Sequence, residues 1–175
     1  SGKTGVVNLH VAPGLGNGLG MLFNAYEGHT PLLVTAGQQD RRLRLREPLL
    51  SADLVAMAAP LSKWSVQVEA ARDLPHVMRL AFKIANDPPM GPVFLSLPID
   101  VMEMETVASP LPPSRAFVRS VPDPDGIVSA AEVLARSRQP MIVCGDGIAH
   151  AGAMDELVRL AELLGAPVWF EALHH

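Results

Sequence analysis

Several kinds of residue are scarce in this sequence. It holds a single cysteine, Cys144, so no internal disulfide can form, and we expect a reducing compartment such as the cytoplasm. Aromatic residues make up 5% of the chain and charged residues 18%, whereas 49% of it is hydrophobic. This composition is typical of a folded chain with an aliphatic core and excludes a disordered one.

Long apolar runs and a strong basic charge are also lacking. No run approaches the roughly 20 apolar residues that span a bilayer, so we expect no membrane partner. The net charge of −4 argues against a nucleic-acid partner. The richest basic stretch, residues 41–46, is flanked by Asp40 and Glu47, which favours a solvated loop. Cys144 lies in an apolar run, which indicates a buried thiol and not a nucleophile.

Strand-like and helix-like segments alternate along the chain up to Asp100. Strands that alternate with helices predict an α/β fold, in which a parallel sheet carries helices on both faces. We expect Ser51 and Asp73 to cap helices. The predicted strands are 6–10, 31–36, 64–68 and 92–97, and the predicted helices are 21–26, 51–59 and 73–85.

The alternation is interrupted after Asp100. Residues 104–124 contain clustered prolines and no periodicity, which predicts a stiff linker. We therefore expect two partial domains, residues 1–103 and residues 125–175. The second is predicted to hold helices at 126–136 and 153–164 and strands at 141–144 and 168–170.

Glycines stand at every second position from 14 to 20, directly after the first predicted strand. Their spacing does not fit the dinucleotide fingerprint G-x-G-x-x-G, which would need a glycine at 19 or 21. The order of strand, glycine turn and helix is still one in which backbone N–H groups can meet a ligand. A tight turn in which glycines relieve backbone strain is an equally good interpretation. In both cases we expect a turn over residues 13–20.

Polar side chains follow the first two predicted strands. His10 ends the first strand and Gln38 follows the second. In parallel α/β sheets ligands bind beyond the carboxyl ends of strands, so His10, Asn17 and Gln38 can converge on one site. An imidazole there can move protons near neutral pH, and the amide of Asn17 can fix a heterocycle. A purely structural histidine is the alternative interpretation.

These segments resemble a known family. Residues 7–20 and 31–39 are similar to the thiamine-diphosphate decarboxylase and acetolactate-synthase superfamily, whose pattern is P-G-x-x-N followed by G-Q after a buried strand. The N-L-H sequence that ends at His10 and the doubled glutamine at 38–39 resemble benzoylformate decarboxylases in particular. Further similar segments are Lys63-Trp64, Gly91-Pro92-Val93, Pro98-x-Asp100 and residues 160–168.

The resemblance implies a cofactor, thiamine diphosphate with Mg²⁺, bound between the pyrimidine domain of one subunit and the diphosphate domain of another. It therefore implies a homo-oligomer, a dimer or a tetramer. The cofactor adds to a 2-keto acid and carbon dioxide leaves, while the protein orients and tunes the cofactor. The resemblance makes His10 the catalytic proton donor and acceptor. The implied cofactor-binding residues are Pro13, Gly14, Asn17 and Gln38.

The resemblance also implies what the chain lacks. The glutamate that activates the cofactor would precede Ser1, and the metal-binding domain would follow the chain, so we expect activity only in the full-length protein. Gly145-Asp-Gly147 looks like the family's metal motif, but no asparagine follows Asn86. We therefore expect a turn there and no metal ligand in this chain.

Three functions follow as hypotheses. The leading one is a 2-keto acid decarboxylase that acts on an aryl substrate such as benzoylformate. An acetolactate-synthase-like carboligase is the second. The third is a non-catalytic module that keeps the fold.

Overall fold

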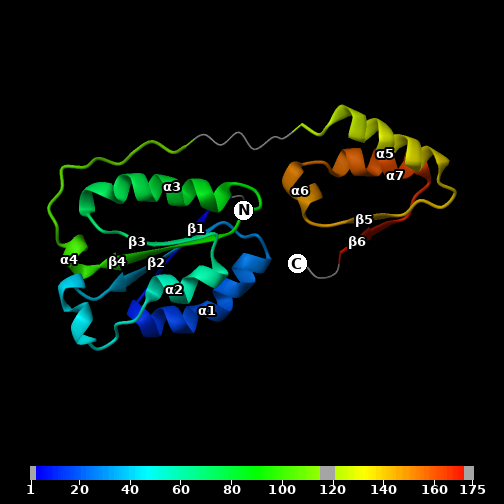
Figure 1. Ribbon diagram of the computed structural model, residues 1–175. Coiled ribbons are helices and arrows are strands. Elements are labelled where there is room, and N and C mark those ends of the chain that lie inside the picture. Colours follow the sequence, from blue (N-terminus) through cyan, green and yellow to red (C-terminus); the bar gives the residue numbers. More distant parts are fainter. Residues whose placement is uncertain (1–2, 115–120, 172–175) are drawn as a thin grey trace. The chain divides into compact units, whose positions relative to one another are not determined.

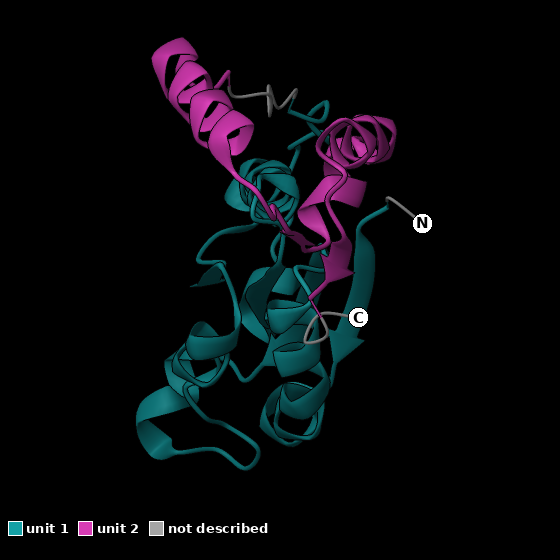
Figure 2. Cartoon of the chain, turned by 90° about the vertical axis from the view of Figure 1, so that its right-hand side faces the viewer, with its two compact units in different colours: residues 1–118 teal, residues 119–175 magenta. Residues whose placement is uncertain are grey.

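The chain divides into two compact units, residues 1–118 and residues 119–175 (Figure 2). The computed structural model describes residues 3–114 and 121–171. The boundary between the units falls inside the proline-rich segment 104–124, and the domain bounds inferred from the sequence stay predictions.

The first unit is built on a four-stranded parallel sheet with the strand order β1-β2-β4-β3 (Figure 1). The helix α3 covers one face, and α1 and α2 cover the other, so the predicted α/β class is confirmed. The strands are β1 (Gly5–Leu9), β2 (Leu32–Gln38), β3 (Trp64–Gln67) and β4 (Pro92–Pro98), and the helices are α1 (Val11–Glu27), α2 (Leu54–Ala58), α3 (Leu74–Asn86) and α4 (Ile99–Met102). Short 3-10 helices occur at η1 (Arg41–Arg46), η2 (Ala59–Leu61) and η3 (Ala71–Asp73).

The two central strands, β2 and β4, form the core because both of their faces are covered. Phe94 and Leu95, neighbours in β4, point to opposite faces of the sheet, and each is 0% exposed. Phe94 packs with Leu15 of α1 and Leu54 of α2, whereas Leu95 packs with Ala81 of α3. Continuous apolar runs are typical of such doubly covered parallel strands, which is why the sequence predicts both of them.

The glycine-rich segment is helical, so the prediction of a turn over residues 13–20 was wrong. The helix α1 begins at Val11 and runs through all of these glycines to Glu27. A glycine inside a helix costs about 1 kcal/mol relative to alanine, but the buried Leu15 and Leu22 anchor the helix on the sheet. Pro13 is tolerated because it lies in the first turn, where the backbone N–H has no intrahelical partner.

Two predicted helix caps also differ from the structure. The helix α2 begins at Leu54, and its cap is Asp53, whose side chain accepts a hydrogen bond from the N–H of Ala56 at 3.0 Å. Ser51 therefore lies before the helix and does not cap it. Asp73 does occupy the cap position of α3, but its side chain makes no capping hydrogen bond.

Lys63 ties the C-terminus of α3 to the sheet. Its Nζ donates to the carbonyls of Ile84 and Asp87, both at 2.5 Å, and so satisfies backbone oxygens that a helix end leaves without partners. The side chain passes over Gly91, where a Cβ would lie only 3.1 Å from Cδ of Lys63. Because burial disfavours a charged ammonium, the pKa of Lys63 is lowered, although the charge of Asp87 opposes the shift.

The second unit contains a two-stranded parallel sheet and three described helices. Leu157 is buried in this unit, and Cys144 is buried as predicted, with its Sγ 3.5 Å from the carbonyl oxygen of Trp169. Among the helices of both units that the structure describes, none is long and apolar enough to cross a bilayer. The elements of this unit are α5 (Pro124–Arg136), β5 (Ile142–Cys144), α6 (Gly147–Ala151), α7 (Met154–Leu164) and β6 (Val168–Phe170).

The doubly covered core gives the first prediction. Replacing the fully buried Leu95 by alanine should lower the free energy of unfolding by about 2–5 kcal/mol, because it leaves a cavity between the sheet and α3. Replacing Leu80 of α3, which is 43% exposed, should cost much less. Urea unfolding followed by circular dichroism measures both, and equal losses would contradict the assigned core.

Candidate functional site

The carboxyl ends of the parallel strands meet at one edge of the first sheet. The register pairs Leu9 of β1 with Ala36 of β2, and Gln38 of β2 with Pro98 of β4. His10 follows β1 directly, so it lies one residue past the Leu9–Ala36 pair. This edge is where parallel α/β sheets bind their ligands.

His10 stands between β1 and α1, at the helix cap position. Its backbone is extended, with φ −96° and ψ 103°, and its carbonyl accepts a hydrogen bond from the N–H of Gly14 at 2.9 Å. A residue at this position often caps the helix with its side chain, but His10 makes no such bond. Its side chain is exposed, so the imidazole is available to a ligand and is not a satisfied core histidine.

Gln38 and Gln39 hold the loop that precedes α2. The amide nitrogen of Gln38, which is 3% exposed, donates to the carbonyl of Ala52 at 2.8 Å, and its oxygen accepts from the N–H of Gln39 at 2.9 Å. The amide nitrogen of Gln39 donates to the carbonyl of Leu49 at 2.9 Å. Gln38 keeps capacity for further hydrogen bonds, but its first role in this structure is to fix the loop. Its assignment to cofactor binding stays a prediction.

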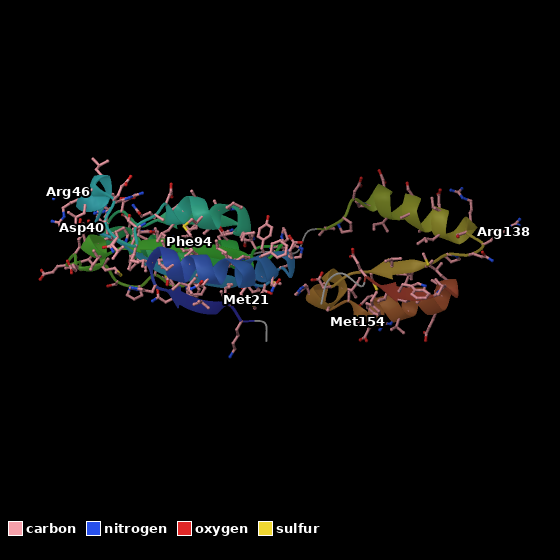
Figure 3. The ribbon with its side chains drawn as sticks, turned by 90° about the horizontal axis from the view of Figure 1, so that it is seen from below. Met21, Asp40, Arg46, Phe94, Arg138 and Met154 are labelled. Atoms are coloured by element: carbon pink, nitrogen blue, oxygen red, sulfur yellow. The ribbon has the colours of Figure 1, made fainter. Side chains whose placement is uncertain are left out.

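Arg41 connects the segments that follow three strands of the first sheet, and we call its contacts with Asp100 and Glu69 the arginine clasp. Its backbone N–H and its Nε donate to the carboxylate of Asp100, after β4, at 3.1 and 2.9 Å. Its Nη1 lies 2.8 Å from Oε2 of Glu69, which follows β3. Figure 3 shows Asp40, which precedes the segment 41–46, and Arg46, which ends it, at one end of the first unit. The segment 41–46 is therefore a 3-10 helix anchored at Arg41, and the prediction of a solvated loop was wrong for this residue.

The arginine clasp controls the ionisation of the neighbouring carboxyl groups. Burial raises the pKa of Asp100, but hydrogen bonds from Arg41 outweigh it and leave this pKa below its ordinary value of 3.8. Hydrogen bonds from Arg42 likewise lower the pKa of Asp40, and a hydrogen bond from Arg41 lowers the pKa of Glu69. The pKa of Arg41 is raised by its bond to Asp100. Each group is thus held in its charged form.

Asn17 and Pro13 lie on the exposed side of α1. Asn17 is seven positions beyond His10, which is about 10 Å along a helix that rises 1.5 Å per residue. The structure therefore places His10 and Gln38 at the edge of the sheet, whereas Asn17 lies two turns along α1. The convergence of these three residues on one site stays a prediction.

The glycines of α1 fall into two groups. A Cβ on Gly18 would lie 2.9 Å from Cδ1 of Leu9, and a Cβ on Gly14 would lie 3.5 Å from the backbone of Leu9, so these two glycines allow α1 to pack closely on β1. A Cβ on Gly16 or Gly20 would meet nothing within 4 Å. Because Gly16 and Gly20 are four residues apart, they lie on the same side of the helix. No packing within the described chain explains them.

The pairing of Arg41 with Asp100 is not predicted from the sequence. A signal for it exists, since Asp100 and Arg41 follow neighbouring strands that are predicted to be parallel. Charged residues at such adjoining strand ends are close enough to pair. The spacing alone does not show which arginine of the segment 41–46 pairs with Asp100.

The described residues do not form a metal site. No group of three or more His, Cys, Asp or Glu residues in positions 3–114 and 121–171 could hold a metal ion. Asp146, in the Gly145-Asp-Gly147 segment, lies 3.6 Å from Nε2 of His150. The expectation that this chain supplies no metal ligand stays a prediction.

Two family models match the chain at its two ends. The thiamine pyrophosphate enzyme N-terminal TPP binding domain matches residues 1–57, and the thiamine pyrophosphate enzyme central domain matches residues 127–175. The chain therefore belongs to the thiamine-pyrophosphate-dependent enzymes, as the resemblance of its motifs implies.

Relatives within this family carry more than one activity in their names. The benzoylformate decarboxylase of Pseudomonas aeruginosa is 38% identical over 172 residues, which are 97% of this chain and 33% of that protein. The acetolactate synthase of Mycobacterium leprae is 31% identical over 172 residues, 96% of this chain and 27% of that protein. The crystal structure of the benzoylformate decarboxylase of Polynucleobacter necessarius has 39% identity and a TM-score of 0.85, over 96% of this chain and 32% of that one. The chain thus spans between 27% and 33% of the length of these relatives.

The clasp predicts a dependence of stability on pH. Because the pKa of Asp100 is lowered in the folded chain, its ionisation stabilises the fold above 3.8, and this contribution is lost as the pH falls through the folded value. Replacing Asp100 by asparagine should lower the melting temperature near neutral pH, and the difference from the wild type should shrink in strong acid. Asp73→Asn, at an exposed site, is the control. A difference between Asp100→Asn and the wild type that is independent of pH would contradict the role of the clasp.

The two groups of glycines predict different effects of alanine. Gly16→Ala should raise the free energy of unfolding by about 0.8–1.0 kcal/mol, because alanine favours the helix and its methyl group meets open space. Gly18→Ala should gain less or lose stability, since its methyl group must displace Leu9. Urea unfolding of both variants tests this, and the reverse order would show that the packing of α1 on β1 is wrongly assigned.

Proposed function

We propose that the protein that carries this chain is a thiamine-diphosphate-dependent decarboxylase of 2-keto acids. The observation that carries the proposal is the placement of His10, an exposed histidine with no capping bond, at the carboxyl edge of a parallel sheet. The proposal is supported by 38% identity to a protein named benzoylformate decarboxylase. Aryl 2-keto acids such as benzoylformate are therefore the first substrates to test.

The residues of this chain suit one part of such a site. When bound, thiamine diphosphate supplies the carbon nucleophile that adds to the keto carbon and takes up the electrons left by carbon dioxide. A ring nitrogen of His10 gives a proton to the reacting centre and later takes one back. Asn17, whose amide has no hydrogen-bond partner among the described residues, can pair with a heterocycle from α1.

The side of α1 around Asn17 allows a flat ring to come close. Gly16 and Gly20 present no side chain there, so a ligand can reach the helix backbone. Pro13 and Gly14 keep the first turn of the helix small at the point nearest to His10. These features support the implied cofactor-binding residues, and Gln38 contributes by holding the loop 49–52.

The proposal includes partners and a location. It places the site between subunits of a homo-oligomer, with Mg²⁺ held by residues outside this chain, and it places the protein in the cytoplasm without a nucleic-acid or membrane partner. The exposure of His10 agrees with a site that a second surface must close.

A carboligase is the second candidate. It is favoured by 31% identity to an acetolactate synthase, a relative whose match covers 96% of the chain. Analysis of the products formed from 2-keto acids separates the two functions. A carboligase would yield a product that joins two substrates in place of free aldehyde.

The test replaces His10 by alanine in the full-length protein. Loss of a positioned proton donor should lower kcat/KM for 2-keto acid decarboxylation by about 100- to 10,000-fold, as measured by release of carbon dioxide and aldehyde. The fold should survive, since the side chain of His10 makes no capping bond. His76→Ala, at an exposed position of α3, is the matched control and should keep the wild-type rate. Unchanged decarboxylation of every 2-keto acid by His10→Ala would overturn the proposal.

A further inference from the structure

The connection between β1 and α1 is unusually short. The strand ends at Leu9 and the helix begins at Val11, so His10 alone separates them. Val11 makes the turn with a φ of +42°, in the left-handed region. A branched side chain disfavours this region, and residues held there against their preference cluster at functional sites.

Packing and one hydrogen bond hold Val11 in this conformation. Its side chain is 7% exposed and lies over Gly37, where a Cβ would stand 4.0 Å from Cγ1 of Val11. The next N–H, that of Ala12, donates to the carbonyl of Leu50 at 3.4 Å. Leu50 is also left-handed, with a φ of +69°.

The partner loop is itself fixed. The carbonyls on either side of Leu50, those of Leu49 and Ala52, accept the amides of Gln39 and Gln38 at 2.9 and 2.8 Å. The left-handed residue Val11 is thus tied to a loop that two buried or half-buried glutamines hold in place.

The strained turn constrains His10 from both sides. On its N-terminal side Leu9 is hydrogen-bonded within the sheet, paired with Ala36. On its C-terminal side the rigid turn at Val11 starts the helix at once, and the carbonyl of His10 already accepts the N–H of Gly14. Hydrogen bonds thus hold the backbone on both sides of the imidazole.

We propose that Val11 is a positioning residue, whose strained left-handed backbone fixes the imidazole of His10 at the edge of the sheet. The inference rests on the proposed function, because it gives His10 a reaction to serve. It assigns to Val11 no contact with substrate or cofactor. Misplacement of a catalytic group by about 1 Å can cost about 100-fold in rate, so a fixed turn has a measurable effect.

The test introduces glycine at two residues with left-handed backbone, Val11 and His29, in the full-length protein and compares kcat and KM of the two variants. Glycine at position 11 adopts the left-handed conformation without strain, but it also allows the turn other conformations. In Val11→Gly, kcat for decarboxylation should therefore fall by about 10- to 100-fold, whereas KM should change far less. His29→Gly makes the same kind of change after the other end of α1, where φ is +46°, and should leave kcat and KM unchanged. The melting temperature of each variant reports whether the fold is kept.

A second variant keeps the test decisive if Val11→Gly does not fold. Val11→Ala retains a Cβ but removes the methyl groups that pack over Gly37, and kcat should again fall more than KM changes. Wild-type kcat in the folded Val11 variants, or an equal loss in His29→Gly, would overturn the inference. If His10→Ala lowers decarboxylation but the Val11 variants do not, only this inference fails. If His10→Ala has no effect either, the proposed function fails.

Discussion

Burial of β2 and β4 on both faces is the constraint on which the rest of the first unit depends. Since Phe94 and Leu95 point to opposite sides and both are fully buried, helices must cover both sides of the sheet. The parallel register then brings the ends of all four strands to one edge. His10, Gln38 and Asp100 are neighbours of that edge for this reason, although they are far apart in the sequence.

The edge is assembled from polar contacts of two kinds. The arginine clasp of Arg41 joins segments that follow β2, β3 and β4 through charged hydrogen bonds. Gln38 and Gln39 instead use neutral amides to hold the loop 49–52. Neither set of bonds involves the imidazole of His10. Gln38, Gln39 and Arg41 therefore hold the backbone at this edge, whereas the side chain of His10 is exposed.

Much of the fold could be predicted from the sequence, and the reasons for success and failure are physical. The strands around 31–36 and 92–97 were predicted because a strand buried on both faces must be apolar throughout. The position of His10 at a strand end followed from the same pattern. The helix over the glycines was missed because local propensity opposes it, and only packing of Leu15 and Leu22 against the sheet reverses that preference. The left-handed Val11 has no local signal, since it depends on packing over Gly37 and on the hydrogen bond of the adjoining Ala12 to Leu50, both remote in the sequence.

The contact between Lys63 and Gly91 has a consequence for how this family varies. The lysine stem occupies the space that any larger residue at 91 would need, and its ammonium group closes the end of α3. A homologue with a larger residue at position 91 must therefore have a shorter side chain, or a lysine in another conformation, at position 63. A homologue without the lysine can have a larger residue at position 91. Residues 63 and 91 should therefore vary together in related sequences, because both lie where the end of α3 meets the sheet.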